Sequence, residues 1–151
     1  MGKVGAEIDV LVAIPVVEEL WYDTRRWPAF VDGFTSVVKK DDGWPEVGGR
    51  LVWQSTAAGR GRVLERVTSY EPGRGQTVEV EDPKLRGVQR VEFEPLADGT
   101  AVALSLDYEL KEPDMPVRPI VDVLFIRRAQ NDALARTLRR FTTEASEQAS
   151  L

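Results

Sequence analysis

Apolar and polar positions along the chain predict seven strands, two short helices and one long helix. Residues 6–12 alternate between apolar and polar side chains, as a half-buried strand does. Pro15 opens a helical segment over residues 15–23, because proline is accepted in a first helical turn, and a second segment follows over residues 24–34. Six short runs that end in turn sequences then predict strands at 36–40, 49–56, 62–70, 76–82, 88–96 and 101–110.

The C-terminal part of the chain has the spacing of one long helix, from about residue 119 to about residue 147. Its stripe at steps of three and four consists of Ile120, Leu124, Arg127, Asn131, Leu134, Leu138, Phe141 and Ala145. Two members of this stripe are polar, and Arg127 carries a permanent charge. Because a buried charge needs a partner or water, Arg127 is a candidate for a functional role.

The order of these elements predicts an α+β fold. A helix with one apolar face needs a sheet to bury it. We expect a seven-stranded antiparallel sheet that curves around the long C-terminal helix, with two short helices after the first strand closing one end. The length of 151 residues suits one domain over residues 1–151.

Charge and composition exclude several kinds of partner. The net charge of -5 argues against nucleic acid, since phosphate contacts need a basic surface. No apolar run approaches the roughly 20 residues of a membrane span, so we expect no stable membrane insertion. The N-terminal segment lacks a small-residue cleavage site, which makes the cytoplasm the default location.

Two missing residue types limit the chemistry. The chain has no Cys and no His, so thiol nucleophiles, thiolate metal sites and imidazole bases are excluded. We therefore expect no metal and no cofactor. Any catalysis would depend on carboxylates, Tyr, Lys, Arg, hydroxyl groups or water.

Alternation along the strands indicates which side chains face the helix. Val63, Glu65 and Val67 share one face, which places Glu65 inside unless a β-bulge reverses the strand. We predict that Glu65 pairs with Arg127 across a cavity, with Asn131 and Tyr108 completing a polar cluster. The candidate ligand-binding residues are Phe30, Phe34, Trp53, Ser55, Glu65, Gln89, Phe93, Tyr108, Leu124, Arg127 and Asn131.

Simpler interpretations of these residues stay open. Arg127 can lie near the cavity mouth and reach solvent on its aliphatic stem. Asn131 can fill a packing gap through a water molecule. Four aromatic candidates can belong to the core, because aromatic side chains dominate cores: Phe30, Phe34, Trp53 and Phe93. The Arg60-Gly61-Arg62 segment is interpreted as a hairpin turn.

The sequence resembles the START-type helix-grip (SRPBCC) superfamily, and within it the polyketide cyclase/dehydrase and lipid transport group. The matching positions are Trp21, Asp23, Arg26-Trp27-Pro28, Phe30, Phe34, Gly48-Gly49, Val63, Glu65 and Pro72. The resemblance implies a helix-grip fold with a ligand cavity between the sheet and the last helix. It implies no particular ligand, because members of the superfamily differ widely in function.

Two functions follow as alternatives. The first is a carrier or sensor that binds a small hydrophobic, aromatic or polyketide-like molecule. The second is a polyketide cyclase, aromatase or dehydrase that acts on a keto-rich substrate. In the second, Arg127 would polarise a carbonyl, while Glu65 or Tyr108 would move protons.

Overall fold

The computed structural model describes residues 2–56, 59–111 and 120–150. All seven predicted strands and the long helix are present in the predicted order. The elements are β1 (Gly2–Val10), α1 (Ile14–Tyr22), the 3-10 helix η1 (Thr24–Arg26), α2 (Trp27–Phe30), β2 (Phe34–Lys40), β3 (Arg50–Ser55), β4 (Arg62–Glu71), β5 (Gly75–Glu81), β6 (Leu85–Leu96), β7 (Gly99–Leu110) and α3 (Ile120–Ala149).

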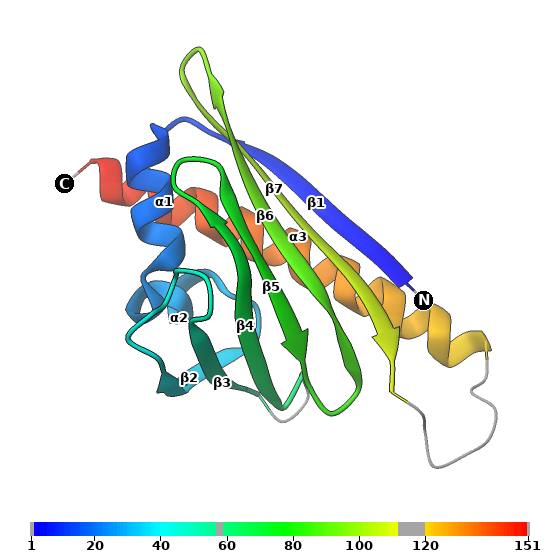
Figure 1. Cartoon of the computed structure of the whole chain (residues 1–151). Coiled ribbons are helices and arrows are strands. Elements are labelled where there is room, and N and C mark those ends of the chain that lie inside the picture. Colours follow the sequence, from blue (N-terminus) through cyan, green and yellow to red (C-terminus); the bar gives the residue numbers. More distant parts are fainter. Residues whose placement is uncertain (1, 57–58, 112–119, 151) are drawn as a thin grey trace.

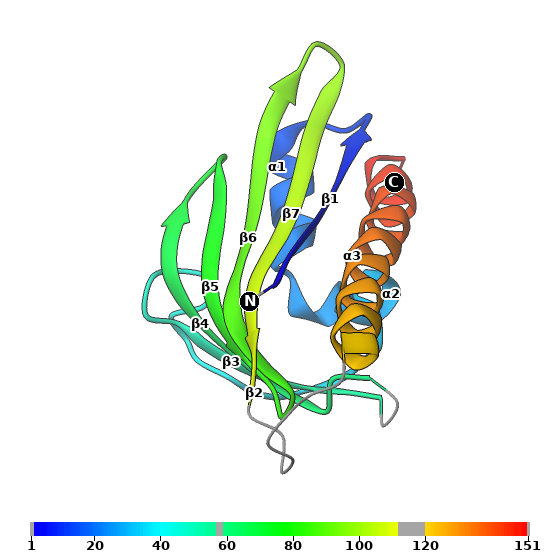
Figure 2. The same ribbon diagram turned by 90° about the vertical axis from the view of Figure 1, so that its right-hand side faces the viewer.

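The strands form one antiparallel sheet in the order β1-β7-β6-β5-β4-β3-β2. Strands β2 to β7 pair with their neighbours in the chain, and β1 closes the series by pairing with β7. The long strands cross over α3 in Figure 1, and the view in Figure 2 shows the curved sheet on one side and α3 on the other. This arrangement confirms the α+β helix-grip fold.

The second helical segment is shorter than predicted. In place of a helix over residues 24–34, the structure has η1 and the four-residue α2, and Phe34 already belongs to β2. The carboxylate of Asp23 accepts the backbone N–H of Arg25 at 3.1 Å and fixes the start of η1. Gly33 has a φ of +74°, a left-handed conformation that glycine adopts without strain, and it redirects the chain into β2.

The C-terminal half of α3 supplies most of the helix's buried contacts. Its predicted stripe is buried at Leu134, Leu138, Phe141 and Ala145. The ring of Phe141 packs edge-on against Trp21 and Phe30, each with a centroid distance of 5.1 Å. Because α1 and α2 meet this half of the helix, they close one end of the space between sheet and helix.

Most described side chains in the N-terminal half of α3 lie outside this core, although Ile126 is partly buried against it. The helix runs along β1, which is the edge strand of the sheet. Leu124 and Phe125 are 59% and 72% exposed, and Arg127 and Asn131 are exposed as well. Among the stripe positions whose burial is described, Leu124 to Ala145, the side chains are therefore buried only from Leu134 onwards.

Candidate functional site

A small cavity lies between the sheet, the α2–β2 turn and α3. Its volume is about 60 Å³. Aromatic side chains form much of its wall, namely Trp21, Trp27, Phe30, Trp44 and Trp53. The polar groups that reach it from the sheet side are Arg60, Glu65, Gln76 and Gln89, and α3 contributes Gln130, Ala133, Leu134 and Thr137. An aromatic cavity with a few convergent polar groups has the usual composition of a small-molecule site.

Glu65 is the buried carboxyl group of this cavity. It points inward from β4, as the alternation of that strand predicts, and is only 6% exposed. The indole Nε1 of Trp53 donates a hydrogen bond to Glu65 Oε2 at 2.7 Å. Burial raises the pKa of Glu65, and the Trp53 hydrogen bond and the charge of Arg60 offset this only in part. Glu65 therefore favours its protonated form more than an exposed glutamate does.

Arg60 brings a positive charge to the same wall from the β3–β4 connection. Its Nε donates to Asp82 Oδ2 at 2.9 Å, and the Asp82 side chain is 1% exposed. Asp82 also accepts the backbone N–H groups of Lys84 and Leu85 at 2.8 and 3.0 Å, so it organises the β5–β6 turn. The guanidinium carbon of Arg60 lies 5.9 Å from the Trp53 ring centroid, within the range of a cation–π contact.

One nitrogen of Arg60 has no partner among the residues that the structure describes. Nη2 is buried and makes no hydrogen bond with any residue that the structure describes. Buried donors are nearly always paired, because an unmade bond costs about 1–3 kcal/mol. Arg60 is one of the residues that line the cavity, together with Glu65, a carboxyl group whose pKa is raised by burial. An oxygen atom of a bound molecule would satisfy Arg60 at this point.

The α2–β2 turn forms another part of the cavity wall and is fastened to α3. The backbone N–H of Asp32 donates to Thr137 Oγ1 at 2.9 Å. The Asp32 carboxylate accepts from Arg136 Nε and Nη2 at 2.9 and 3.0 Å, and from Arg140 Nη1 at 3.1 Å. The hydrogen bonds from Arg136 in particular lower the pKa of Asp32. These partly exposed contacts hold the turn against the helix.

Several of the predicted site residues lie at or near the cavity. Phe30, Trp53, Glu65 and Gln89 line it. The buried hydroxyl of Ser55 accepts the backbone N–H of Arg60 at 2.8 Å and so positions the arginine without lining the cavity. Further from it, Phe34 packs on Trp53, and Phe93 and Tyr108 are buried in the core.

The three predicted residues on α3 are not part of this cavity, and the predicted pair of Arg127 with Glu65 is wrong. Leu124, Arg127 and Asn131 are exposed and border a surface recess beside β1. Glu65 lies on β4, four strands from β1 in the sheet, which corresponds to roughly 19 Å at about 4.8 Å per strand. Arg127 reaches solvent, as the alternative interpretation holds.

Arg60 and Asp82 were missed as site residues by reasoning from the sequence. The Arg60-Gly61-Arg62 segment reads as a hairpin turn, and the turn does exist, with Gly61 at a φ of +76°. A turn motif predicts the path of the backbone but not the direction of a long side chain. The position of Asp82 directly after an alternating strand was the only available signal, and it indicates a turn as readily as a site.

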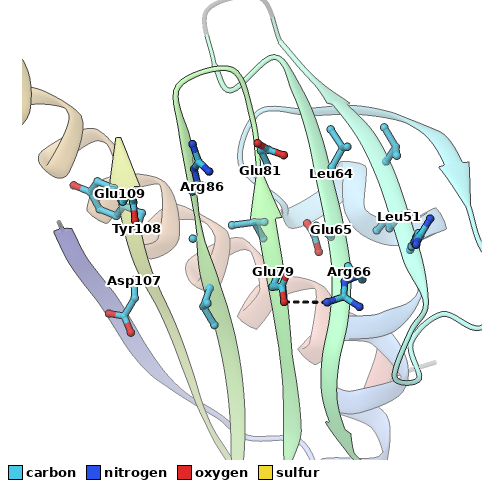
Figure 3. A pocket seen from close by; sticks show the side chains of 15 residues that line it. Leu51, Leu64, Glu65, Arg66, Glu79, Glu81, Arg86, Asp107, Tyr108 and Glu109 are labelled. Carbon is cyan, nitrogen blue, oxygen red and sulfur yellow. Dashed lines mark hydrogen bonds and ion pairs between the residues drawn. The ribbon is translucent and has the colours of Figure 1, made fainter. Parts of the chain in front are cut away.

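A larger hollow of about 660 Å³ lies on the other side of the sheet. Figure 3 shows its lining, in which Leu64, Arg66, Glu79, Glu81 and Arg86 project from adjacent strands and the dashed line joins Arg66 to Glu79. Outward-facing, mostly charged side chains dominate it. It lacks the buried, unpartnered donor of the inner cavity, and for that reason we place the candidate ligand site between sheet and helix.

Comparison with known proteins agrees with this fold. The model of the family described as "Polyketide cyclase / dehydrase and lipid transport" matches residues 1–146. The chain belongs to this family. No curated protein matches the sequence.

Solved structures share the fold at low sequence identity. A START superfamily protein from Mycobacterium smegmatis aligns with a TM-score of 0.76 and 13% identity, covering 97% of this chain and 99% of that one. TTHA0849 from Thermus thermophilus aligns with a TM-score of 0.75 and 19% identity, covering 96% and 97%. The di-domain ARO/CYC StfQ from the steffimycin biosynthetic pathway aligns with a TM-score of 0.79 and 16% identity, covering 99% of this chain and 52% of StfQ.

Proposed function

We propose that this protein is a carrier or sensor that binds a small aromatic or otherwise apolar molecule in the cavity between sheet and α3. The observation that carries the proposal is Arg60, which lines an aromatic cavity together with Glu65 and whose buried Nη2 has no hydrogen-bond partner among the described residues. The family description, which includes lipid transport, supports the binding of an apolar molecule.

The polar groups define which ligand chemistry fits. Arg60 Nη2 can only donate, so it requires an oxygen acceptor such as a carboxylate, carbonyl or phenol oxygen. Glu65 in its protonated form adds an O–H donor, and Trp53 already occupies Oε2 of that carboxyl group. The aromatic walls suit the rest of the ligand. We infer a ligand with an oxygen group at one end and a flat apolar body.

The size of the cavity limits the ligand. Ligand pockets usually measure about 300–1,000 Å³, whereas this cavity measures about 60 Å³. A bound molecule of even one ring must therefore displace side chains. The contacts of Asp32 with Arg136 and Arg140 are partly exposed, so breaking these ion pairs costs little and would let the α2–β2 turn separate from α3.

Catalysis on a keto-rich substrate is the second candidate function. The raised pKa of Glu65 favours it, because burial keeps this carboxyl group protonated to a higher pH than an exposed glutamate and so makes it a candidate proton donor. Arg60 would then polarise the substrate carbonyl. StfQ, which shares this fold, is described as an ARO/CYC, and this makes cyclisation worth testing. A proton-transfer enzyme should show a bell-shaped dependence of rate on pH, whereas ligand binding alone produces no turnover.

Native mass spectrometry of the purified protein tests the proposed function. We expect an apolar small molecule to leave the protein on denaturation. Ala133 lines the cavity on α3, so Ala133→Phe should fill the cavity and prevent the molecule from co-purifying. Ala129→Phe is the matched control, because Ala129 is exposed on the same helix. A molecule that both variants retain equally would contradict a ligand site in this cavity.

A further inference from the structure

The larger hollow on the outer face of the sheet is a groove that crosses the five strands β3 to β7. Its two banks are rows of outward-pointing side chains, and its floor is the row between them, whose side chains point inward. The strand pairing places the members of each bank side by side. One bank consists of Arg50, Arg66, Glu79, Val88 and Asp107, and the other of Val52, Leu64, Glu81, Arg86 and Glu109. Figure 3 shows members of both rows on adjacent strands.

Apolar side chains interrupt the charged ones in both banks of this groove. Leu64 is 46% exposed although it lies on an inner strand of the sheet, and Val52, its direct cross-strand neighbour, is half-buried. Val88 on β6 is half-buried as well. All three side chains point away from the core, because the residues on either side of Leu64, for example, are buried in it. Grouped apolar side chains on an outer face mark an interaction surface more often than isolated ones do.

The charges of the groove are distributed unevenly across the strands. Among its outward-pointing residues, β3 and β4 contribute only basic ones, Arg50 and Arg66, whereas β7 contributes only acidic ones, Asp107 and Glu109. Neither Arg50 nor Asp107 forms an ion pair with a residue that the structure describes. The face is therefore basic at one end and acidic at the other, with an unpaired charge at each end.

The middle strand of the groove, β5, is balanced within the chain. Its two outward carboxylates are those of Glu79 and Glu81. Glu79 forms an ion pair with Arg66 at 3.1 Å, and Glu81 forms one with Lys111 at 3.0 Å. Each carboxylate of β5 therefore has a cation beside it, and this reduces its repulsion toward another negative group that approaches the face.

We propose that this outer face of the sheet binds a second copy of the same chain. A half-turn about an axis parallel to β5 places β3 of one copy over β7 of the other, and β4 over β6. Arg50 then meets Asp107 of the second copy, and the contact occurs twice because the same patch is used on both copies. Leu64 meets the aliphatic stem of Arg86 of the second copy. Sheets that pack face to face keep their strand directions within about 30°, as this arrangement does.

Charge complementarity selects a second copy over other partners. A partner surface with one sign of charge would match only Arg50 or only Asp107 and would leave the other end of the face unmatched. A copy of the same face, turned by half a turn, matches both ends at once. The same arrangement brings β5 over β5 of the second copy, where each carboxylate already has its cation.

The contact between the two copies is small and reversible. Five strands at about 4.8 Å each make a face about 24 Å wide, and two such faces would bury less than about 1,200 Å² in total. Interfaces of this size form weak, transient complexes. The dimer leaves α3 and the α2–β2 turn uncovered, because both lie on the other side of the sheet (Figure 2). Dimerisation and ligand binding in the inner cavity can therefore fail independently.

Sedimentation velocity over a range of protein concentrations tests the proposal. We expect the wild type to change from monomer to dimer in the micromolar range. Raising the salt from 0.1 M to 1 M should shift it back toward monomer, because the Debye length falls from about 10 Å to about 3 Å. Leu64→Arg should weaken dimerisation by at least about tenfold, because it sets a cation against Arg86 of the second copy. Leu64 points away from the core, so the variant should fold like the wild type.

Charge reversal tests the contact between Arg50 and Asp107 directly. Arg50→Glu brings two carboxylates together, and Asp107→Arg brings two cations together. Each variant alone should therefore stay monomeric at concentrations where the wild type dimerises. A mixture of the two variants should dimerise again, because in a mixed pair the two reversed side chains have opposite signs and meet each other. The unreversed Asp107 of one chain and Arg50 of the other also meet.

Arg139→Glu and Glu147→Arg are the matched controls for charge reversal. Both residues are exposed on α3, on the other side of the sheet, and both variants should dimerise like the wild type. The proposal is overturned if the wild type stays monomeric at all concentrations, if Leu64→Arg dimerises like the wild type, or if the mixture of Arg50→Glu and Asp107→Arg stays monomeric. A small molecule found in the groove of a monomeric wild type would contradict it as well.

Discussion

Replacing Asp82 by alanine is expected to lower the free energy of unfolding by about 3–5 kcal/mol, because it leaves the Arg60 charge without its partner. Arg60 Nε and two backbone N–H groups, those of Lys84 and Leu85, all donate to the Asp82 carboxylate. The Asp82 side chain is only 1% exposed, so solvent barely reaches this part of the structure. Removing the carboxylate therefore leaves these donors without a hydrogen-bond acceptor. Urea unfolding of the wild type and the variant measures the difference.

Glu79→Ala is the matched control for this substitution. Glu79 lies on β5, the strand that Asp82 directly follows. Its carboxylate forms an ion pair with Arg66 at 3.1 Å. Both side chains of that pair are about half exposed, so its loss should cost less than about 1 kcal/mol. Equal losses in the two variants would show that Asp82 is not the buried anchor of Arg60.

Replacing Glu65 by glutamine is expected to stabilise the protein at neutral pH, by about 1.4 kcal/mol for each unit by which burial raises the pKa of Glu65. Glutamine keeps an oxygen that can accept the Trp53 hydrogen bond. It cannot ionise, and so it avoids the cost of a buried negative charge. Urea unfolding across a series of pH values measures the effect.

The pH dependence fixes the sign of this prediction. Burial raises the pKa of Glu65 in the folded protein above the ordinary value of 4.5, so the folded state binds a proton that the unfolded state has already released. The free energy of unfolding of the wild type therefore falls as the pH rises from about the ordinary pKa of glutamate to the raised pKa of Glu65 in the folded protein. The Glu65→Gln variant should lack this decline, and the two proteins should converge in acid.

Glu92→Gln, at an exposed position, should follow the wild type. A stability difference that is largest in acid would contradict the assignment.

The sheet and the inner position of Glu65 could be predicted from the sequence, since both depend on a two-residue alternation that the strands preserve. Val63, Glu65 and Val67 are buried together, as the pattern in β4 indicates. The bulge in the pairing of β4 with β5 falls after Val67 and leaves the face of Glu65 unchanged. Local periodicity was sufficient here because the side-chain direction follows directly from the backbone.

The position of α3 over the sheet could not be predicted in the same way. Helical spacing shows which residues share a stripe, but it does not show at which residue other elements begin to bury that stripe. The stripe is buried at Leu134 and Leu138, where α2 and the sheet cover it, and exposed at Leu124, where the helix passes the edge strand. Arg127 therefore interrupts an apolar stripe without entering the core.

The Arg60 site was beyond sequence reasoning for a different reason. Arg60, Glu65 and Asp82 come from a hairpin connection, a strand interior and the end of another strand. Their meeting depends on the pairing of β3, β4 and β5 and on the rotamer of one long side chain. Ser55 contributes by accepting the Arg60 backbone N–H, a contact that no local pattern indicates.

Calorimetric titration with benzoate and with toluene tests the central claim most directly, because the two probes share a ring and differ in the oxygen group that Arg60 should bind. Arg60→Lys keeps a positive charge beside Asp82 but removes the second guanidinium nitrogen. We predict that the wild type binds benzoate more tightly than toluene. Arg60→Lys should weaken benzoate binding by roughly tenfold or more, the value of a hydrogen bond to a charged group, and leave toluene binding unchanged. Equal affinity of both proteins for benzoate would contradict the assignment of Arg60 as the group that holds the ligand.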